Sequence, residues 1–263
     1  MSAEREKISC IIGTKNAEVD ISDCIESVIW TDEIIVIDDF STDKTLEIAR
    51  RYTNKIYQHP FQSYTQQKDF AVKKTCFRWV LSLDADERVS PQLKESILQK
   101  LNEGPQFDGY LCSRMNFFLG KQVKGCGWYE KNNLRFFNKE RVSYNIGYYY
   151  LEEMNINGKI GRLTHDLLHY TCRELSGYLN RINIWSTLNA KDLINKGLRI
   201  TYLNSSFYFF FKPGAIFFYK YFFKSGFRDG IVGLVICVLS VITYFFSYAK
   251  VWELQQRGRN PIA

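Results

Sequence analysis

The sequence lacks several patterns that define common protein classes. Its seven cysteines include no CxxC pair, and an odd number resists a closed disulfide framework, so we expect reduced and mostly buried thiols. The absence of a GxGxxG motif excludes a dinucleotide oxidoreductase, and no nucleic-acid-binding motif is visible. The opening residues, MSAEREKISC, carry charge where a signal peptide needs an apolar run. We therefore expect the catalytic part to remain in the cytoplasm.

The composition is that of a folded chain with an unusual C-terminal region. Apolar residues make up 46% of the 263 residues and charged residues 24%, which favours a large core over disorder. The net charge is +7, and seven basic residues but only two acidic residues follow position 201. Because these basic residues are interleaved with aromatic ones, an anionic membrane surface is favoured as a partner over nucleic acid.

The first hundred residues alternate between short apolar runs and helical patterns, which is typical of βαβ units and a mainly parallel sheet. Strands are expected at 8–12, 33–38, 55–59 and 77–83, and helices at 18–29, 41–52, 62–74 and 91–101. From 107 to 140 short strands and turns follow, so the sheet should become mixed. The predicted class is therefore a Rossmann-like α/β fold over 1–175, in halves 1–104 and 105–175, followed by a helical region over 176–263.

Polar side chains follow three of these strands at the edge where open parallel sheets bind ligands. They are Thr14, Lys15 and Asn16, then Asp38 and Asp39, and then Asp84 and Asp86. The carboxylates would repel one another unless cations or hydrogen-bond donors offset their charge. The pair Asp84-x-Asp86 can hold Mg²⁺ or Mn²⁺, which usually also binds phosphate oxygens and waters; the alternative is a pair of surface acids.

Two further residues have open readings from sequence. Asp39 can accept a hydrogen bond from a base or a ribose hydroxyl, or it can cap the helix that follows it. Lys68, in TQQKDFA, can approach a phosphate or a base, or it can belong to a solvated helix face.

Taken in order, IIGTKN, IIVIDDFSTDKT, QQKDFA and WVLSLDADERVSPQL resemble the motifs of inverting family 2 glycosyltransferases with the GT-A fold. The resemblance continues through FFLGK, GCGWYEKNNLRFF, NGKIGRLTHDLLHY and GFRDGIVGL, and covers about residues 6–253. This order is similar to that of the bacterial lipopolysaccharide-core β-1,4-glucosyltransferase group.

The resemblance implies a UDP-sugar donor, most simply UDP-glucose, and a saccharide or lipid-linked acceptor at the cytoplasmic face of the bacterial inner membrane. The nucleotide-sugar-binding positions that it implies are Thr14, Asn16, Asp38, Asp39, Lys68 and Asp84. Asp84 and Asp86 match the motif for the divalent cation and the diphosphate. Residues 1–104 would then form the nucleotide-sugar-binding half, and residues 105–175 the half that binds the acceptor and supplies the base.

The base in this group lies in a His-Glu pair. Here Leu151 occupies the histidine position and Glu152 the glutamate position, so Glu152 is the candidate base and Glu153 the fallback. Such a base removes the proton of the acceptor hydroxyl as its oxygen attacks the anomeric carbon, and the configuration inverts.

Several groups are candidates for acceptor binding. Trp128 and Tyr129 offer stacking surfaces and Arg135 a clamp for phosphate or carboxylate, although Trp128 is equally suited to core packing. His165 and His169 are four residues apart, a spacing that would suit a metal on a helix. Because no third ligand is apparent nearby, we favour a structural role for both.

The C-terminal region has the composition of a membrane-associating segment. Residues 207–223 hold eleven aromatics in seventeen positions, and residues 230–249 carry no charge. Twenty such residues are long enough to span a bilayer, but basic residues flank them on both sides. We favour helices in the interface, or a shallow re-entrant hairpin, over a spanning helix or a soluble core helix.

Two other functions remain open at this point. An apolar strand followed by Asp-x-Asp also resembles phosphatases of the haloacid dehalogenase type, although Arg88 stands where those usually have Thr or Val. The replacement of the expected histidine by Leu151 leaves open a membrane-anchored protein that binds a sugar nucleotide without transferring the sugar.

Overall fold

The computed structural model describes residues 5–145, 149–150 and 154–259. They form two compact units. Unit 1 contains the described residues of 1–115 and 130–170, and unit 2 those of 116–129 and 171–263. The expected division at 175 differs from these units in two respects, because the boundary falls at 170 and the segment 116–129 belongs with the C-terminal helices.

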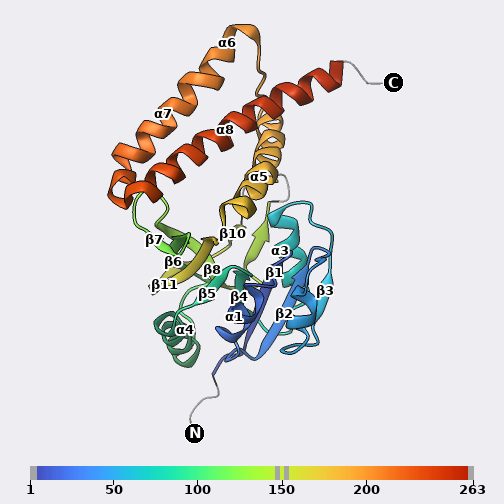
Figure 1. Cartoon of the computed structure of the whole chain (residues 1–263). Helices are drawn as coiled ribbons and strands as arrows, with labels where there is room; N and C mark the ends of the chain where they lie inside the picture. Colours follow the sequence, from blue (N-terminus) through green and yellow to red (C-terminus); the bar gives the residue numbers. More distant parts are fainter. Residues whose placement is uncertain (1–4, 146–148, 151–153, 260–263) are drawn as a thin grey trace. The chain divides into compact units, whose positions relative to one another are not determined.

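Unit 1 begins with parallel strands joined by short helices (Figure 1). The strands lie in the order β3-β2-β1-β4 and are parallel to one another. Their bounds are Ile8–Thr14 for β1, Glu33–Asp38 for β2, Ile56–Gln58 for β3 and Trp79–Asp84 for β4. The connecting helices are α1 (Ile21–Glu26), α2 (Thr45–Ala49) and α3 (Tyr64–Val72). The sequence predicted all of these elements, but α1 and α2 are much shorter than expected.

The second half of the sheet is antiparallel, as the change of pattern predicted. The order continues from β4 through β8, β6 and β11 to β5, with bounds Glu130–Asn138, Gly109–Phe118, Ile160–Cys172 and Glu87–Val89. Helix α4 (Pro91–Glu103) follows β5 and is capped by the Ser90 hydroxyl, which accepts from Leu93 N. A separate hairpin pairs β9 (Val142–Tyr144) with β10 (Met154–Ile156).

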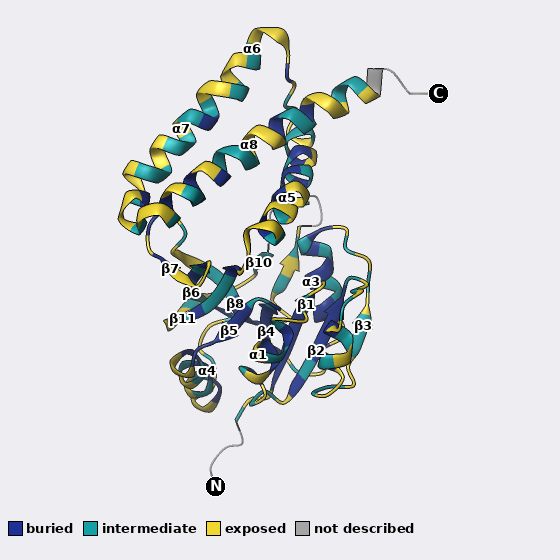
Figure 2. Cartoon of the chain, viewed as in Figure 1, coloured by how far each residue is buried: buried dark blue, intermediate teal, exposed yellow. Residues whose placement is uncertain are grey.

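Alternating side chains of the central strands pack on the two faces of the sheet. Ile8, Cys10 and Ile12 of β1 pack with residues of α1 and α4, whereas Ile11 packs on the other face against α3. Both faces are covered, so β1, β2 and β4 are almost entirely buried (Figure 2), which is why they read as continuous apolar runs. Burial on both sides makes this half of the sheet a rigid support for the loops at its edge.

Unit 2 consists mainly of helices. Helix α5 (Leu175–Asn195) and helix α8 (Gly230–Arg259) are long, and a segmented helix lies between them in the chain. Its parts are α6 (Tyr202–Ser206), the π-helical η1 (Phe207–Phe211), α7 (Lys212–Phe218) and the π-helical η2 (Tyr219–Phe223), and the 3₁₀ turn η3 (Gly226–Asp229) follows it. Pro213 lacks an amide hydrogen, which accounts for the irregular hydrogen bonding just before it. The strand β7 (Lys121–Val123) pairs with the end of β6 in this unit.

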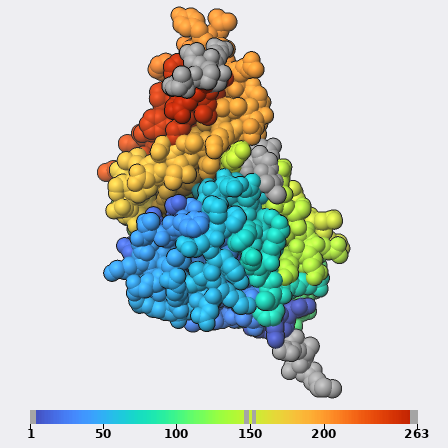
Figure 3. Space-filling view, turned by 90° about the vertical axis from the view of Figure 1, so that its right-hand side faces the viewer, coloured from blue at the N-terminus to red at the C-terminus, as the bar shows by residue number. Residues whose placement is uncertain are grey.

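Many large apolar side chains of unit 2 are exposed. Phe223 and Ile231 are each 81% exposed, and the orange side chains of 202–223 stand at the surface in Figure 3. The helix over Gly226–Arg257 is long and apolar enough to cross a membrane. Only 28% of its apolar 18-residue stretch is buried. This low burial argues against the core helix of a soluble unit.

The buried carboxylate of Glu33, at the start of β2, makes the stability of unit 1 depend on pH. It accepts hydrogen bonds from Ser9 Oγ at 2.5 Å and from Cys76 N at 2.8 Å, and it pairs with Lys55. Burial alone would raise the pKa of Glu33, but these donors outweigh burial and lower the pKa from 4.5 to about 2. The ionised form is thus favoured in the folded state, and its contribution is present above about pH 4.5 and lost as the pH falls toward 2.

Glu33→Gln should lower the free energy of unfolding by about 2–3 kcal/mol at neutral pH. The difference from the parent should stay constant down to about pH 4.5 and narrow below it, because the Glu33 carboxylate of the unfolded parent then begins to be protonated while that of the folded parent stays ionised until about pH 2. Urea unfolding across this pH range measures it. Glu47→Gln is the matched control, because Glu47 pairs with Arg51 on an exposed helix face. A difference that is independent of pH would contradict the assignment.

Candidate functional site

The polar residues predicted at the strand ends do lie side by side at one edge of the sheet. In the register of the parallel strands, Gly13 is opposite Asp84, and Thr14 is opposite Asp38. Gln58, at the end of β3, is opposite Asp38 on the other side. The carboxyl ends of β1, β2, β3 and β4 therefore share this edge, which is where open α/β sheets bind their ligands.

The loops after β1 and β2 are fastened together by hydrogen bonds between side chains and backbone. Asn16 N donates to Ser41 Oγ at 2.8 Å, and Asn16 Oδ1 accepts from Thr42 N at 2.9 Å. Ala17 N donates to Thr45 Oγ1 at 2.7 Å. The side chain of Asn16 is thus engaged with the neighbouring loop, a placement that favours shaping the site over direct contact with a nucleotide.

Asp38 and Asp39 are adjacent in sequence but differ in their surroundings. Asp38 is fully buried, and its carboxylate accepts hydrogen bonds from Ser41 and from Gln58 Nε2 at 3.2 Å. Asp39 is partly accessible and pairs with Lys15 Nζ at 2.6 Å, while its Oδ1 accepts from Phe61 N at 2.9 Å. The Asp38 carboxylate therefore stabilises the turn after β2, and Asp39 is the carboxylate of the pair that is accessible to solvent.

Thr14 ends β1 beside this pair. Its side chain is 8% exposed, and its buried hydroxyl has no hydrogen-bond partner in the described part of the chain. A buried hydroxyl at a ligand-binding edge is costly unless something satisfies it. The arrangement fits a ligand that accepts or donates a hydrogen bond at this point.

Asp84 lies between two cationic side chains. Its Oδ1 is 3.6 Å from Lys68 Nζ of α3, and its Oδ2 is 3.0 Å from an Arg135 guanidinium nitrogen of β8. Burial by itself would raise the pKa of Asp84, but Lys68 and Arg135 outweigh it and hold the pKa well below its usual range. Asp84 is consequently ionised throughout the neutral range.

Glu87 is the buried centre of the same network. It has no exposed surface, and it contacts Arg135 at 2.6 Å and Arg114 at 3.3 Å. Its second oxygen accepts from Asp84 N at 3.0 Å. Arg114, Arg135 and Lys68 thus offset the charges of Asp84 and Glu87. They are the cations that the sequence analysis required to offset repulsion among the carboxylates at this edge. Sequence reasoning did not assign Glu87 or Arg114 to the site, because their pairing depends on strands far apart in the chain.

Asp86 is next to His169, which the sequence did not lead us to expect. The distance from Asp86 Oδ1 to His169 Nε2 is 3.4 Å. His169 lies on strand β11, not on a helix, and β11 pairs with β5 so that His169 is opposite Glu87. Among the described residues no group of three or more His, Cys, Asp or Glu side chains is arranged to hold a metal, but Asp86 and His169 together form a carboxylate and imidazole pair.

The remaining predicted residues are distributed over the chain. Arg135 is buried and paired with Asp84 and Glu87, which favours a role in positioning Asp84 over one in holding an acceptor. Trp128 belongs to unit 2 and packs with Phe118 and Tyr178, consistent with its alternative reading as a core residue. Tyr129, also in unit 2, is 38% exposed.

The proposed bases fall in a part of the chain that the structure does not describe. Leu151, Glu152 and Glu153 lie outside the described residues. Their assignment therefore stays a prediction.

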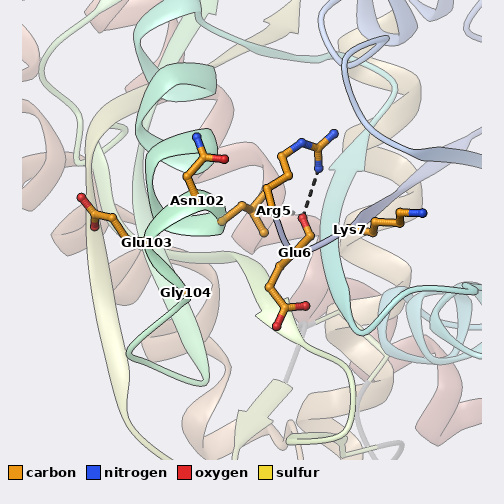
Figure 4. Close-up of a pocket in the computed structure, with 7 residues that line it drawn as sticks. Arg5, Glu6, Lys7, Asn102, Glu103 and Gly104 are labelled. Atoms are coloured by element: carbon orange, nitrogen blue, oxygen red, sulfur yellow. Dashed lines mark hydrogen bonds between the residues drawn. The ribbon is translucent and has the colours of Figure 1, made fainter. Parts of the chain in front are cut away.

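A cavity lies elsewhere on unit 1, between the start of β1 and the end of α4 (Figure 4). Its lining includes Arg5, Lys7, Asn102 and Glu103. Arg5 is paired with Asp32 at 2.7 Å. Because the cavity is at the amino ends of the strands, it does not coincide with the cluster around Asp84.

The fold and the site together define a GT-A-type protein. The structure is similar to that of glucosyl-3-phosphoglycerate synthase from Mycobacterium tuberculosis, solved in complex with Mn²⁺, UDP-glucose and phosphoglyceric acid. The TM-score is 0.51 and the identity 17%, over 78% of this chain and 86% of that chain. At this identity the likeness establishes the fold.

Sequence comparisons then establish the family. The Glycosyl transferase family 2 description matches residues 9–163, and the chain belongs to that family. An uncharacterised glycosyltransferase of Rickettsia typhi is 31% identical, over 98% of this chain and 91% of its own length. The lipopolysaccharide core biosynthesis glycosyltransferase LpsC of Rhizobium meliloti is 26% identical, over 97% of this chain and 95% of its own length. The protein is a glycosyltransferase, which excludes the phosphatase alternative.

The network around Glu87 yields a stability prediction. Arg135→Met should lower the free energy of unfolding by about 3–5 kcal/mol, because it leaves the buried carboxylate of Glu87 without its nearest cation and removes one of the two cations beside Asp84. In the double variant with Glu87→Gln, part of this loss should be recovered, since one of the unpaired charges is removed.

Urea unfolding of the single and double variants measures this coupling. Arg162→Met is the control, because Arg162 is an exposed arginine whose guanidinium binds Asn132 and a backbone carbonyl. Strictly additive effects of Arg135→Met and Glu87→Gln would contradict the network.

Proposed function

We propose that this glycosyltransferase transfers a sugar, most simply glucose, from a UDP-sugar to a hydroxyl group of a saccharide or lipid-linked acceptor, with inversion at the anomeric carbon. The observation that carries the proposal is the set of carboxylates and compensating cations gathered at the carboxyl ends of β1, β2 and β4. The relative LpsC, named for lipopolysaccharide core biosynthesis, supports an acceptor of bacterial surface glycan or lipopolysaccharide synthesis. The UDP-glucose complex of the structural neighbour supports the donor class.

The donor would lie along this edge of the sheet. Asp39 would accept a hydrogen bond from the base or the ribose, in exchange for its present partner Lys15. The Thr14 hydroxyl, which lacks a partner among the described residues, would be satisfied by the nucleotide. Lys68, now 3.6 Å from Asp84, would share its charge between that carboxylate and a phosphate of the donor.

A divalent cation fits the residues at Asp86. The carboxylate of Asp86 and the imidazole of His169 are both donors that Mn²⁺ accepts, and Mg²⁺ is bound readily by a carboxylate together with phosphates and waters. When bound, the ion would supply positive charge at the leaving diphosphate. Asp84 would orient this arrangement from its position between Lys68 and Arg135.

The chemical step needs a base and a means of offsetting charge. Glu152, with Glu153 as the fallback, is the candidate that would take the proton of the acceptor hydroxyl. As the bond from the anomeric carbon to the diphosphate breaks, negative charge grows on the leaving group, and the ammonium of Lys68 would offset part of that charge.

The place of action would be the cytoplasmic face of the bacterial inner membrane. The long apolar helix α8 and the exposed aromatic side chains of unit 2 support association with a membrane. A peripheral or monotopic attachment would bring the enzyme to lipid-linked acceptors.

Transfer and hydrolysis of UDP-glucose in the presence of Mn²⁺ or Mg²⁺ test the assignment. Asp86→Ala and His169→Ala should each lower turnover by roughly 100-fold or more, because each removes a ligand of the cation. Calorimetry should show that UDP binding by these variants no longer strengthens when Mn²⁺ is added. Glu140→Ala, a substitution of an exposed carboxylate, is the control. Full turnover without a divalent cation would overturn the metal assignment.

A second experiment addresses the base. Glu152→Gln should abolish transfer and leave UDP binding unchanged, and proton NMR of the product should show the inverted anomer. Activity that survives in Glu152→Gln but not in Glu153→Gln would move the role to Glu153. Activity in both variants would place the base elsewhere, and a product of retained configuration would refute the inverting mechanism.

A further inference from the structure

The exposed apolar side chains of unit 2 come from two helical segments that pack on each other. The segment 202–223 and helix α8 contribute the surface that we call the aromatic surface, which includes Phe210, Phe211, Phe218, Phe223 and Ile231. These side chains are 59–81% exposed. Figure 2 shows exposed residues along the length of both segments. Contiguous exposed apolar surface of this kind marks a binding surface.

Basic residues are interleaved with this surface. Lys212, Lys220, Lys224 and Arg228 lie within or next to the aromatic segment. The nearest acid in sequence is Asp229. Its carboxylate accepts hydrogen bonds from two backbone amides, Lys124 N at 3.1 Å and Gly125 N at 2.7 Å. The surface is therefore both apolar and positively charged, which suits anionic headgroups above a hydrocarbon layer.

The contacts of the lysines show which orientation the helices can take. Lys220 Nζ donates to Ser240 Oγ at 3.0 Å, and Ser240 is in the middle of the uncharged run 230–249. Lys212 lies over the rings of Tyr208 and Tyr248, with its Nζ 5.2 and 5.3 Å from their centroids. If α8 crossed a bilayer, Lys220 would be carried to the centre of the hydrocarbon, where an ammonium group is strongly disfavoured.

A third lysine contact fixes the other end of α8. Lys250 Nζ donates to the carbonyl and side chain of Asn183 and to the hydroxyls of Ser186 and Thr187, all on α5, at 2.6–2.8 Å. Charged groups are thus tied to α8 at its middle and at its end. A helix lying in the plane of the interface keeps all of them near the headgroups, where lysine side chains can extend toward water.

We propose that the aromatic surface binds an anionic lipid bilayer, with α8 and the segment 202–223 both lying in the plane of the interface and neither crossing it. This inference rests on one part of the proposed function, namely that the enzyme meets its acceptor at a membrane. A second copy of the chain is disfavoured as the occupant, because two such surfaces would bring like charges together.

Sedimentation with vesicles tests the lipid and the surface. The full-length protein should bind vesicles that contain phosphatidylglycerol at least about tenfold more tightly than vesicles of phosphatidylcholine alone, because the basic residues add to apolar insertion. Phe210→Ser combined with Phe223→Ser should weaken binding to both kinds of vesicle by about tenfold or more. Lys224→Gln combined with Arg228→Gln should remove most of the preference for the anionic lipid.

Val19→Ser combined with Ile29→Ser is the matched control, because both side chains are 65% exposed but belong to unit 1. Equal loss of binding in the control would overturn the assignment of the surface. So would a protein that ignores vesicles and instead forms dimers that Phe210→Ser and Phe223→Ser disrupt.

Labelling from one side of the membrane tests the orientation. In a Cys76→Ser background, which removes the exposed native thiol, Arg228→Cys and Arg257→Cys place one thiol beyond each end of the apolar run. In sealed inverted membrane vesicles, an impermeant maleimide should label both positions from the cytoplasmic side. If one of the two positions is labelled in intact vesicles and the other is labelled only once the membrane has been permeabilised, the helix spans the membrane and the proposal is overturned. Turnover of UDP-glucose measured in detergent separates a failure of this inference from a failure of the proposed function.

Discussion

The repulsion among carboxylates at the carboxyl edge of the sheet is the constraint on which the site depends. Asp84 and Glu87 are too close to carry their charges without compensation, and Glu87 has no contact with solvent. Lys68, Arg114 and Arg135 supply that compensation from a helix and two antiparallel strands. The mixed half of the sheet is therefore part of the site, because it brings the arginines to the end of a parallel strand.

This balance of charge also accounts for what the site can bind. Under the proposed function, a diphosphate would bring further negative charge to an edge that already holds several carboxylates, and the lysine, the arginines and a cation at Asp86 would offset it. The hydrogen-bonded loops after β1 and β2 leave Asp39 partly accessible, whereas the Asp38 carboxylate accepts hydrogen bonds that stabilise the turn. The hydrogen-bonded loops and the compensated charges support the proposal that this edge is the donor site of a family 2 glycosyltransferase.

Local patterns predicted the parallel strands, their helices and the residues at their ends, because apolar runs and helix caps depend on neighbours in sequence. The cap at Ser90 and Pro91 is an example. What could not be predicted depends on pairing between distant segments. Strand β5 exists only because β11 pairs with it, and that pairing brings His169 to Asp86. The spacing of His165 and His169 would suit a metal only on a helix, and the two residues lie on strand β11, where side chains four residues apart are too distant to share an ion. Arg135 was predicted to be a clamp for phosphate or carboxylate, because nothing in the local sequence indicates its buried partners Asp84 and Glu87.

The most direct test of the central claim is a crystal structure of the protein with UDP-glucose and Mn²⁺. We predict the nucleotide at the carboxyl ends of β1 and β2 against Thr14 and Asp39, the diphosphate beside Lys68, and the cation bound by Asp86 and His169. The buried pairing of Arg135 with Glu87 should be unchanged. A nucleotide bound at another place, such as the cavity at Arg5 and Lys7, or a cation held without Asp86, would contradict it.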